Sequence, residues 1–186
     1  PAVIRRIRQR SEKSWSSAAG GWKVQRSSAA ISARIALISR SRSPSAADLD
    51  LLRAFEQERG VRFYLQSGGP ATVRPLTEPA PVLSYALPEA GVVLQFEPGD
   101  FIEVNGARNR LLVQRAITLL APGPGSRVLD LYCGLGNFTL ALARHAAAVV
   151  GVEGDTGLVE RARANARRNG IDNVTFHAAN LAVAPA

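Results

Sequence analysis

The feature that most constrains the fold is a buried strand that runs directly into a glycine turn. Residues 128–138 read Val-Leu-Asp-Leu-Tyr-Cys-Gly-Leu-Gly-Asn-Phe, and a second apolar run, residues 146–152, ends at the acid Glu153. In a strand–helix–strand unit of this kind the glycines let the backbone approach a ligand, and the acid accepts hydrogen bonds from ribose hydroxyls. The pattern therefore predicts a nucleotide-type site at Gly134, Gly136 and Glu153.

The type of cofactor is narrowed by the residue that follows the two glycines. A dinucleotide fingerprint needs a third glycine, and Thr139 stands at that position. The form D-x-x-x-G-x-G-N, which begins at Asp130, resembles the first motif of Rossmann-like methyltransferases. Their cofactor, S-adenosyl-L-methionine, has a ribose and an adenine but no pyrophosphate, so that two glycines suffice. The alternative is an ordinary tight turn without a ligand.

The composition limits the class of protein. A chain of 186 residues, 46% of them apolar, can form one moderate domain with an appendage. Its apolar runs are far shorter than a membrane span, and we expect a cytoplasmic protein with no membrane partner. The single cysteine, Cys133, excludes a disulfide framework and a complete zinc or iron–sulfur cluster within this chain, so no metal site is predicted.

The net charge of +8 is concentrated at one end of the chain. Residues 1–44 hold ten Lys or Arg and one acid, whereas residues 45–186 hold thirteen Lys or Arg and fourteen acids. We expect the basic, Ser- and Arg-rich residues 1–44 to be disordered or non-native, because they bury too little apolar surface to offset their ordering entropy. A basic arm for RNA and an organelle transit peptide are the alternatives.

Residues 45–106 predict a small α+β subdomain. Ser45 and Asp48 form a capping box that starts a helix, and Gly60 ends it. A strand over residues 61–66 follows. Breaks at Pro and Gly separate further short strands, which are expected near residues 73–76, 83–87 and 92–96.

Residues 107–186 predict the amino-terminal part of a methyltransferase domain. A helix is expected over 107–120. Strands and helices then alternate, as is typical of a parallel sheet, with strands at 127–132, 148–153 and 174–178 and helices at 137–145 and 156–169. The fold class is α/β: a partial Rossmann-like S-adenosylmethionine-dependent methyltransferase fold that follows the small α+β subdomain.

Five segments together resemble the RNA (uracil-5-)-methyltransferases, and among these the branch that methylates a uridine of bacterial 23S ribosomal RNA. They are residues 96–105, 128–138, 152–154, 165–170 and 173–176, and the resemblance extends over about residues 35–181. The combination is more specific than the glycine turn alone. It implies S-adenosyl-L-methionine as cofactor, ribosomal RNA as partner and methylation at carbon 5 of a uridine.

Carried over residue by residue, the resemblance places the cofactor-binding positions at Glu103, Tyr132, Gly134, Gly136, Asn137, Glu153 and Asn180. Tyr132 stands where the family often has phenylalanine, and it could instead be a half-buried aromatic at a strand end. Asn137 could instead cap the following helix. Glu153 carries the sharpest signal, because a carboxylate at the end of an apolar strand is costly to bury without a partner.

Glu103 departs from the family, which typically has glutamine at this position. A carboxylate there attracts the ammonium or sulfonium of the cofactor but repels its carboxylate. It also lacks the N–H donors of an amide. The departure therefore bears on the affinity for the cofactor.

No catalytic residue is assigned. Carbon-5 methylation of uracil uses a cysteine thiolate that adds to carbon 6 before a base removes the carbon-5 proton. The resemblance places that cysteine and base beyond Asn180, whereas Cys133 lies in the cofactor turn and is expected to pack under it. We therefore expect an internal piece of the enzyme, inactive alone. The alternatives are a methyltransferase for another substrate that shares only the turn, and a non-catalytic truncated product with a basic RNA-binding arm.

Overall fold

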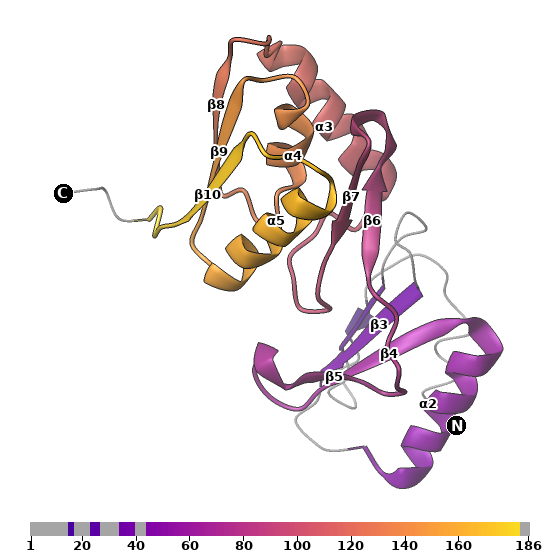
Figure 1. The fold of residues 1–186 in the computed structure, drawn as a ribbon. Coiled ribbons are helices and arrows are strands. Elements are labelled where there is room, and N and C mark those ends of the chain that lie inside the picture. The colour runs from indigo at the N-terminus through magenta and orange to yellow at the C-terminus, as the bar shows by residue number, and fades with distance from the viewer. Residues whose placement is uncertain (1–14, 17–22, 27–33, 40–43, 183–186) are drawn as a thin grey trace. The chain divides into compact units, whose positions relative to one another are not determined.

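The computed structural model describes residues 15–16, 23–26, 34–39 and 44–182, and its elements are labelled in Figure 1. The described chain divides into two compact units, of which the first ends at Ala80 and the second begins at Pro81. This boundary differs from the expected one after residue 106, because the hairpin at residues 84–95 belongs with the second unit.

The first unit contains a five-stranded sheet in the order β1-β2-β3-β4-β5. Strands β3 and β4 are parallel and are connected by helix α2, whereas the other neighbours pair antiparallel. A 3₁₀ turn, η1 (Pro70–Thr72), precedes β5. The elements are β1 (Trp15–Ser16), β2 (Lys23–Arg26), β3 (Arg34–Ser39), α2 (Ala46–Arg59), β4 (Val61–Gln66) and β5 (Val73–Pro75).

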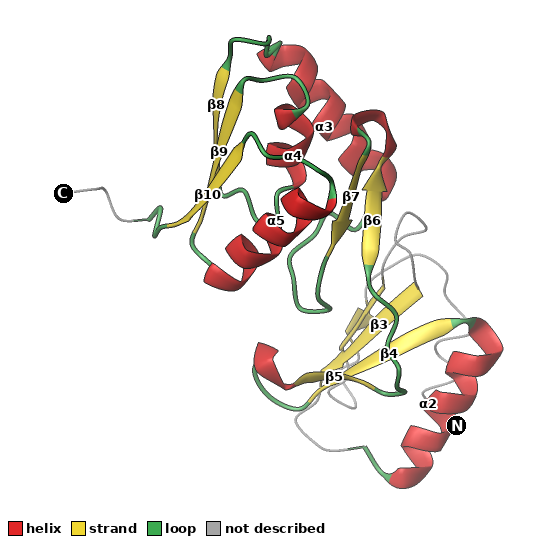
Figure 2. Cartoon of the chain, in the orientation of Figure 1, coloured by secondary structure: helices red, strands yellow, loops and turns green. Residues whose placement is uncertain are grey.

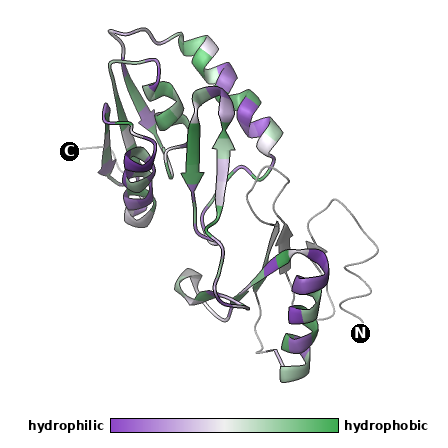
Figure 3. Ribbon diagram, turned by 45° about the vertical axis from the view of Figure 1, so that its right-hand side comes forward, coloured by the Kyte–Doolittle hydropathy of each residue, from purple (hydrophilic) through white to green (hydrophobic). Residues whose placement is uncertain are grey.

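Helix α2 begins and ends where the sequence predicts. The Ser45 side chain accepts from the Asp48 backbone N–H at 3.2 Å, and the Asp48 side chain accepts from the Ser45 N–H at 3.0 Å, which completes the capping box. Gly60 ends the helix with a φ of 60°, a left-handed conformation that glycine adopts without strain. Hydrophilic and hydrophobic residues alternate along this helix (Figure 3), as expected of a helix with one buried face.

The predicted disorder of residues 1–44 is wrong for β3. Ala36 and Ile38 are each 3% exposed, and they belong to the core of the first unit together with Leu52, Phe55 and Phe63. A short apolar run that looks insufficient in isolation gains its partners from α2 and from the parallel strand β4. Residues 1–14, 17–22, 27–33 and 40–43 lie outside the described residues, and the expectation for them stays a prediction.

A buried carboxylate joins α2 to the sheet of the first unit. Glu56 is 6% exposed. Its Oε1 accepts from the Phe63 backbone N–H at 2.7 Å, and its Oε2 accepts from the Thr77 hydroxyl at 2.6 Å. Both oxygens therefore have partners, as burial of a carboxylate requires.

The second unit combines an antiparallel hairpin with a three-stranded parallel sheet in the order β10-β9-β8. Helices α4 and α5 lie on one face of this sheet (Figure 2). This follows because the connections from β8 to β9 and from β9 to β10 move in the same direction along the sheet, and such connections are right-handed. Each helix and strand predicted for this unit is confirmed, and a short 3₁₀ turn, η2 (Pro88–Ala90), lies between the two hairpin strands. The helices and strands are β6 (Ser84–Leu87), β7 (Val92–Gln95), α3 (Gly106–Leu120), β8 (Arg127–Leu131), α4 (Asn137–Ala143), β9 (Ala148–Glu153), α5 (Thr156–Arg168) and β10 (Val174–Ala178).

Two asparagines of the α5 segment hold the hairpin. Asn165 exchanges hydrogen bonds with the backbone of Gln95 at 2.9 and 3.1 Å, and Asn169 does the same with Val93 at 2.8 and 2.7 Å. Residues four apart lie on the same face of a helix, and the distance between them is close to the distance between alternate residues of a strand. Asn165 and Asn169 can therefore reach Gln95 and Val93 at the same time. The two amides thus satisfy the free edge of β7, which explains why the hairpin belongs to this unit.

The face of the parallel sheet opposite the helices carries exposed leucines. Leu129 and Leu131 alternate along β8 and are 61% and 49% exposed. Within the described residues, β8 pairs with β9 alone. In the same part of the chain, no helix is long and apolar enough to cross a membrane.

Candidate functional site

The chain turns sharply after β8. Three residues of this turn have backbone torsions in the left-handed region: Tyr132 with φ 60°, Gly134 with φ 56° and Gly136 with φ 96°. Glycine adopts this region freely, but for tyrosine it costs about 1–3 kcal/mol, and such strain clusters at ligand sites. The backbone therefore singles out this turn as the first candidate site.

The two glycines serve different purposes. A Cβ built on Gly134 meets no atom within 4 Å, so the backbone at this point is open to an approaching ligand. A Cβ on Gly136 lies 3.1 Å from Leu140 Cγ, so this glycine also permits close packing of the turn on α4. Both were singled out by the sequence, and the structure supplies a separate reason for each.

The structure brings Glu153 to the glycine turn. Its Oε2 accepts from the Gly134 backbone N–H at 3.1 Å, and its Oε1 accepts from the N–H groups of Gly154 at 2.7 Å and Asp155 at 3.1 Å. Strands β8 and β9 are parallel neighbours, which places their carboxyl ends together. The carboxylate thus lies where the sequence spacing predicts, and it also ties the two strand ends to each other.

Asn137 does not cap α4, because Gly136 holds the cap position and no side chain caps this helix. Its amide instead pairs with that of Asn109. Asn109 Nδ2 donates to Asn137 Oδ1 at 2.9 Å, and Asn137 Nδ2 donates to Asn109 Oδ1 at 2.9 Å. The hydroxyl of Tyr85 donates to the same Asn137 Oδ1 at 3.0 Å. A polar network from β6, α3 and α4 therefore lies directly behind the glycine turn.

Sequence reasoning missed Asn109 and Tyr85. Asn109 is 2% exposed and lies on the same helix face as the buried Val113, so a polar residue on an apolar face was the available signal. Tyr85 is 8% exposed, and burial raises its pKa well above the usual range. Its hydroxyl therefore stays protonated and remains a hydrogen-bond donor.

Tyr132 and Asn180 lie at the same edge of the sheet. The Tyr132 side chain is 68% exposed, rather than half-buried, and its hydroxyl donates to the Leu181 carbonyl at 3.3 Å. The Ala179 N–H donates to the Glu153 carbonyl at 2.9 Å, and the exposed Asn180 accepts from the Ala182 N–H at 3.0 Å. The segment after β10 thus runs beside the end of β9.

Glu103 lies at the start of α3. Its Oε1 accepts from the Asn105 backbone N–H at 3.0 Å, and the Asn105 side chain caps the helix by accepting from the Arg108 N–H at 3.1 Å. The side chain of Glu103 is exposed. Among the contacts of the described residues, none joins Glu103 to the glycine turn, so it is the one predicted residue that the structure does not bring to the others.

Cys133 has the surroundings of an unreactive thiol. It is 5% exposed, and its Sγ lies 2.9 Å from where a Cβ on Gly151 would be. Burial raises its pKa to about 12, and the negative charges of Asp130 and Glu153 act in the same direction.

Asp130 itself accepts from the Thr139 hydroxyl at 2.6 Å, and burial raises the pKa of this carboxyl group too. Within the described residues, no group of three metal-ligating side chains occurs.

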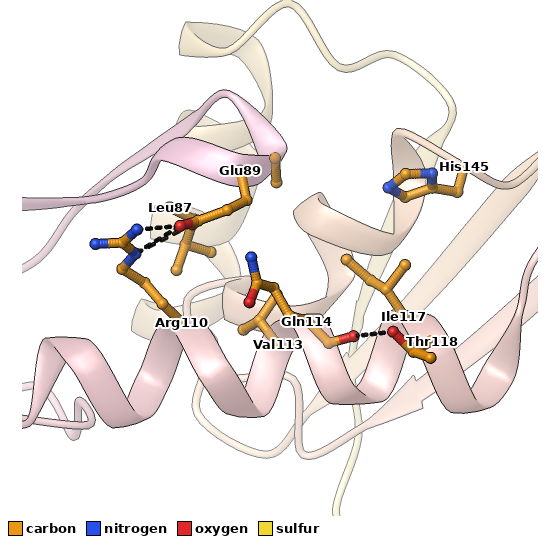
Figure 4. Close-up of a pocket in the computed structure, with 9 residues that line it drawn as sticks. Leu87, Glu89, Arg110, Val113, Gln114, Ile117, Thr118 and His145 are labelled. Atoms are coloured by element: carbon orange, nitrogen blue, oxygen red, sulfur yellow. Dashed lines mark hydrogen bonds and ion pairs between the residues drawn. The ribbon is translucent and has the colours of Figure 1, made fainter.

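A separate pocket of about 320 Å³ lies between η2, α3 and the loop after α4 (Figure 4). Arg110 and Glu89 form an ion pair at its rim, and Thr118 donates to the Gln114 carbonyl at 2.9 Å. His145 follows the carboxyl end of α4, whereas the glycine turn precedes its amino end. The pocket and the turn are therefore distinct sites. The pocket is lined by Leu87, Glu89, Ala90, Arg110, Val113, Gln114, Ile117, Thr118 and His145.

Solved structures support the fold. The chain superimposes on a tRNA (uracil-54, C5)-methyltransferase from Pyrococcus abyssi, solved with S-adenosyl-L-homocysteine, with a TM-score of 0.59 over 86% of this chain and 38% of that one, at 17% identity. For Trm5b from the same organism the TM-score is 0.56 over 79% of this chain and 46% of that one, at 18% identity. The second unit thus has a Rossmann-like methyltransferase fold.

Sequence comparisons agree. Residues 122–185 match a family model described as a methyltransferase domain. A 23S rRNA (uracil(1939)-C(5))-methyltransferase from Alkalilimnicola ehrlichii is 54% identical over 153 residues, which are 81% of this chain and 34% of the relative. The corresponding protein of an Azoarcus species is 54% identical over 137 residues, 73% of this chain and 32% of the relative. The chain thus spans about one third of the length of such relatives, and over that third it is similar to 23S rRNA (uracil-C5)-methyltransferases.

Proposed function

We propose that this chain forms the cofactor-binding part of an S-adenosyl-L-methionine-dependent enzyme that methylates carbon 5 of a uridine in 23S ribosomal RNA in the cytoplasm. The identity of 54% to proteins of that name supports the substrate. The observation that carries the cofactor site is the Glu153 carboxylate, held 3.1 Å from the Gly134 nitrogen at the carboxyl edge of the parallel sheet. Ligands of open α/β sheets bind at this edge.

The residues at this edge fit the cofactor chemically. Glu153 offers a carboxylate to a ribose diol, and Gly134 offers open backbone. The exposed ring of Tyr132 offers an apolar face beside them, and the Asn180 amide can donate to an adenine nitrogen. When bound, the cofactor supplies an electrophilic methyl group on a positively charged sulfur. The negative charge of Glu153 favours that cation.

The chain's own residues bind and orient in this proposal, and none of them attacks the uracil. The nucleophile of carbon-5 methylation has to be a thiolate. Cys133 is the only cysteine of the chain, and its burial and its pKa of about 12 keep it a thiol near neutral pH. We therefore propose that the chain by itself binds the cofactor without methylating RNA, and that it holds no iron–sulfur cluster.

Calorimetric titration of the 186-residue chain with S-adenosyl-L-homocysteine tests the binding proposal. We expect one site per chain and no heat with NAD, because Thr139 replaces the glycine of the dinucleotide fingerprint. Circular dichroism confirms that the titrated chain is folded. A folded chain that does not bind S-adenosyl-L-homocysteine, or that binds NAD more tightly, contradicts the proposal.

A second experiment tests whether the chain by itself methylates RNA. The chain is incubated with unmodified 23S rRNA and methyl-labelled S-adenosyl-L-methionine, with the Cys133→Ser variant as control. We expect no label at carbon 5 of any uridine with either protein. Label that appears with the original chain and disappears with Cys133→Ser would identify Cys133 as the nucleophile and overturn this part of the proposal.

A further inference from the structure

The geometry behind the glycine turn points to two positioning residues, Tyr85 and Asn109, which fix the side-chain amide of Asn137 so that it presents an N–H to an acceptor atom of the cofactor. This inference rests on the proposed function, since it concerns how the same site holds S-adenosyl-L-methionine. Neither residue belongs to the glycine turn. They lie 52 and 28 positions before Asn137 in the sequence.

The orientation of the Asn137 amide is decided by Tyr85. An asparagine pair can exchange its two hydrogen bonds in two orientations, related by turning both amides over. The hydroxyl of Tyr85 donates at 3.0 Å to Asn137 Oδ1. If the amide of Asn137 turned over, its NH₂ group would face this hydroxyl and could not accept the proton. Tyr85 is 8% exposed, so a hydroxyl proton without an acceptor is disfavoured there.

Asn109 then holds the selected orientation. Its own side chain is 2% exposed, and both ends of its amide are used by Asn137, at 2.9 Å each. Its place in the first turn of α3, after the cap residue Asn105, is fixed by the helix. A buried amide on a rigid helix has little freedom to turn, so the two hydrogen bonds with Asn109 keep the Asn137 amide in one orientation.

The network leaves Asn137 as a donor toward the ligand. Oδ1 accepts two hydrogen bonds, from Tyr85 and from Asn109, which fills both of its lone pairs. In the part of the chain that the structure describes, Nδ2 donates one bond, to Asn109, and its second N–H is left for a ligand. Asn137 directly follows Gly136 in the turn, so this N–H serves an acceptor atom there, such as a carboxylate oxygen or a ring nitrogen.

The test compares Tyr85→Phe and Asn109→Leu with a matched control, Asn173→Ala. Asn173 is also a partly buried asparagine that supports α4, but its Nδ2 donates to the carbonyls of Ala143 and Ala146 at 2.9 Å each, at the other end of the helix. Calorimetry gives the dissociation constant for S-adenosyl-L-homocysteine at a temperature where all variants are folded, and thermal unfolding gives their stability. Nitrogen NMR follows the Asn137 side-chain amide.

We expect Tyr85→Phe to weaken binding about fivefold, the loss equivalent to one hydrogen bond of about 1 kcal/mol, and Asn109→Leu to weaken it at least as much. Asn173→Ala should lower the melting temperature without changing affinity. Addition of S-adenosyl-L-homocysteine should shift the Asn137 amide resonances in the original chain.

Two results overturn the inference while the proposed function stands: equal affinity of the original chain, Tyr85→Phe and Asn109→Leu, or an affinity loss in Asn173→Ala that matches theirs. Either would mean that the network contributes stability alone. If the folded original chain does not bind S-adenosyl-L-homocysteine, the inference and the proposed function fail together.

Discussion

Oε2 of Glu153 lies 3.1 Å from the backbone nitrogen of Gly134, so the acid that ends β9 holds the turn that follows β8. The same carboxylate accepts from the N–H groups of Gly154 and Asp155, which makes three backbone donors in all. An ionised carboxylate has about four acceptor positions. A ribose diol needs two of these acceptor positions, and three are already used by the backbone N–H groups. Cofactor binding to Glu153 therefore requires that one backbone hydrogen bond is shared with a ribose hydroxyl or released.

Replacement of Glu153 should weaken cofactor binding. Glu153→Ala removes the acceptor of the ribose hydroxyls, and a charge-assisted hydrogen bond of this kind contributes about 1.5–3 kcal/mol. Calorimetry with S-adenosyl-L-homocysteine measures the loss. Glu160→Ala, an exposed acid of α5 paired with Arg163, serves as control and should bind normally. Unchanged affinity in Glu153→Ala would show that the family's ribose contact does not transfer to this position.

Replacement of Glu103 by glutamine should leave affinity for the cofactor unchanged or improve it. An amide oxygen can still accept from the Asn105 N–H, which Glu103 Oε1 accepts at 3.0 Å, so the start of α3 is preserved. If the contact implied by the family resemblance transfers to this position, the change removes a negative charge that repels the cofactor's carboxylate and adds N–H donors. Titration of both proteins with S-adenosyl-L-homocysteine decides the question. A sharp loss of affinity in Glu103→Gln would mean that the carboxylate itself contacts the ligand.

The thiol of Cys133 should resist alkylation in the folded protein. With its pKa raised to about 12, only about one thiol in ten thousand is ionised at pH 8, compared with about one in four for an ordinary cysteine. Because the pKa of Cys133 is higher in the folded chain than in the unfolded chain, its contribution to the free energy of unfolding is complete below the unfolded-state pKa. This contribution is lost as the pH rises toward 12. Mass spectrometry after iodoacetamide treatment, with and without denaturant, measures the protection. Rapid modification of the folded chain would contradict it.

Gly151→Ala should destabilise the second unit. The added Cβ would lie 2.7 Å from Phe176 Cδ1 and 2.9 Å from Cys133 Sγ, in a core where Phe176 is 3% exposed. Overpacking of this kind costs about 1–3 kcal/mol. The control is Gly125→Ala, where a Cβ meets nothing within 4 Å. Urea unfolding should show a lower free energy of unfolding for Gly151→Ala alone, and equal stability of the two variants would be evidence against the packing described for β9.

We expect the chain to self-associate through the exposed face of β8, and Leu129→Lys should reduce this association. Leu129 is 61% exposed on the face of β8 that carries no helix, and a strand with an exposed apolar face tends to pair between molecules. Loss of one buried leucine contact corresponds to about tenfold weaker association. Sedimentation velocity over a range of concentrations measures it. Leu111→Lys, at a 67% exposed position of α3, is the control. If both variants reduce association equally, β8 has no special part in it.

The sequence by itself determined the order of helices and strands from α2 onward and the identity of the glycine turn. These follow from local properties. Ser45 and Asp48 cap a helix from positions three apart, Gly60 adopts a left-handed torsion, and apolar spacing distinguishes strand from helix. The proximity of Glu153 to the turn was also accessible, because neighbouring parallel strands end at the same edge of a sheet.

Only the tertiary structure decided which distant residues meet. The core position of β3 depends on α2 and β4, and the place of the hairpin in the second unit depends on Asn165 and Asn169. The bonds of Asn137 to Tyr85 and Asn109 join three elements across 52 and 28 positions. Such contacts depend on how helices are rotated and packed, to within the short range of a hydrogen bond, and no local pattern of residues specifies that rotation.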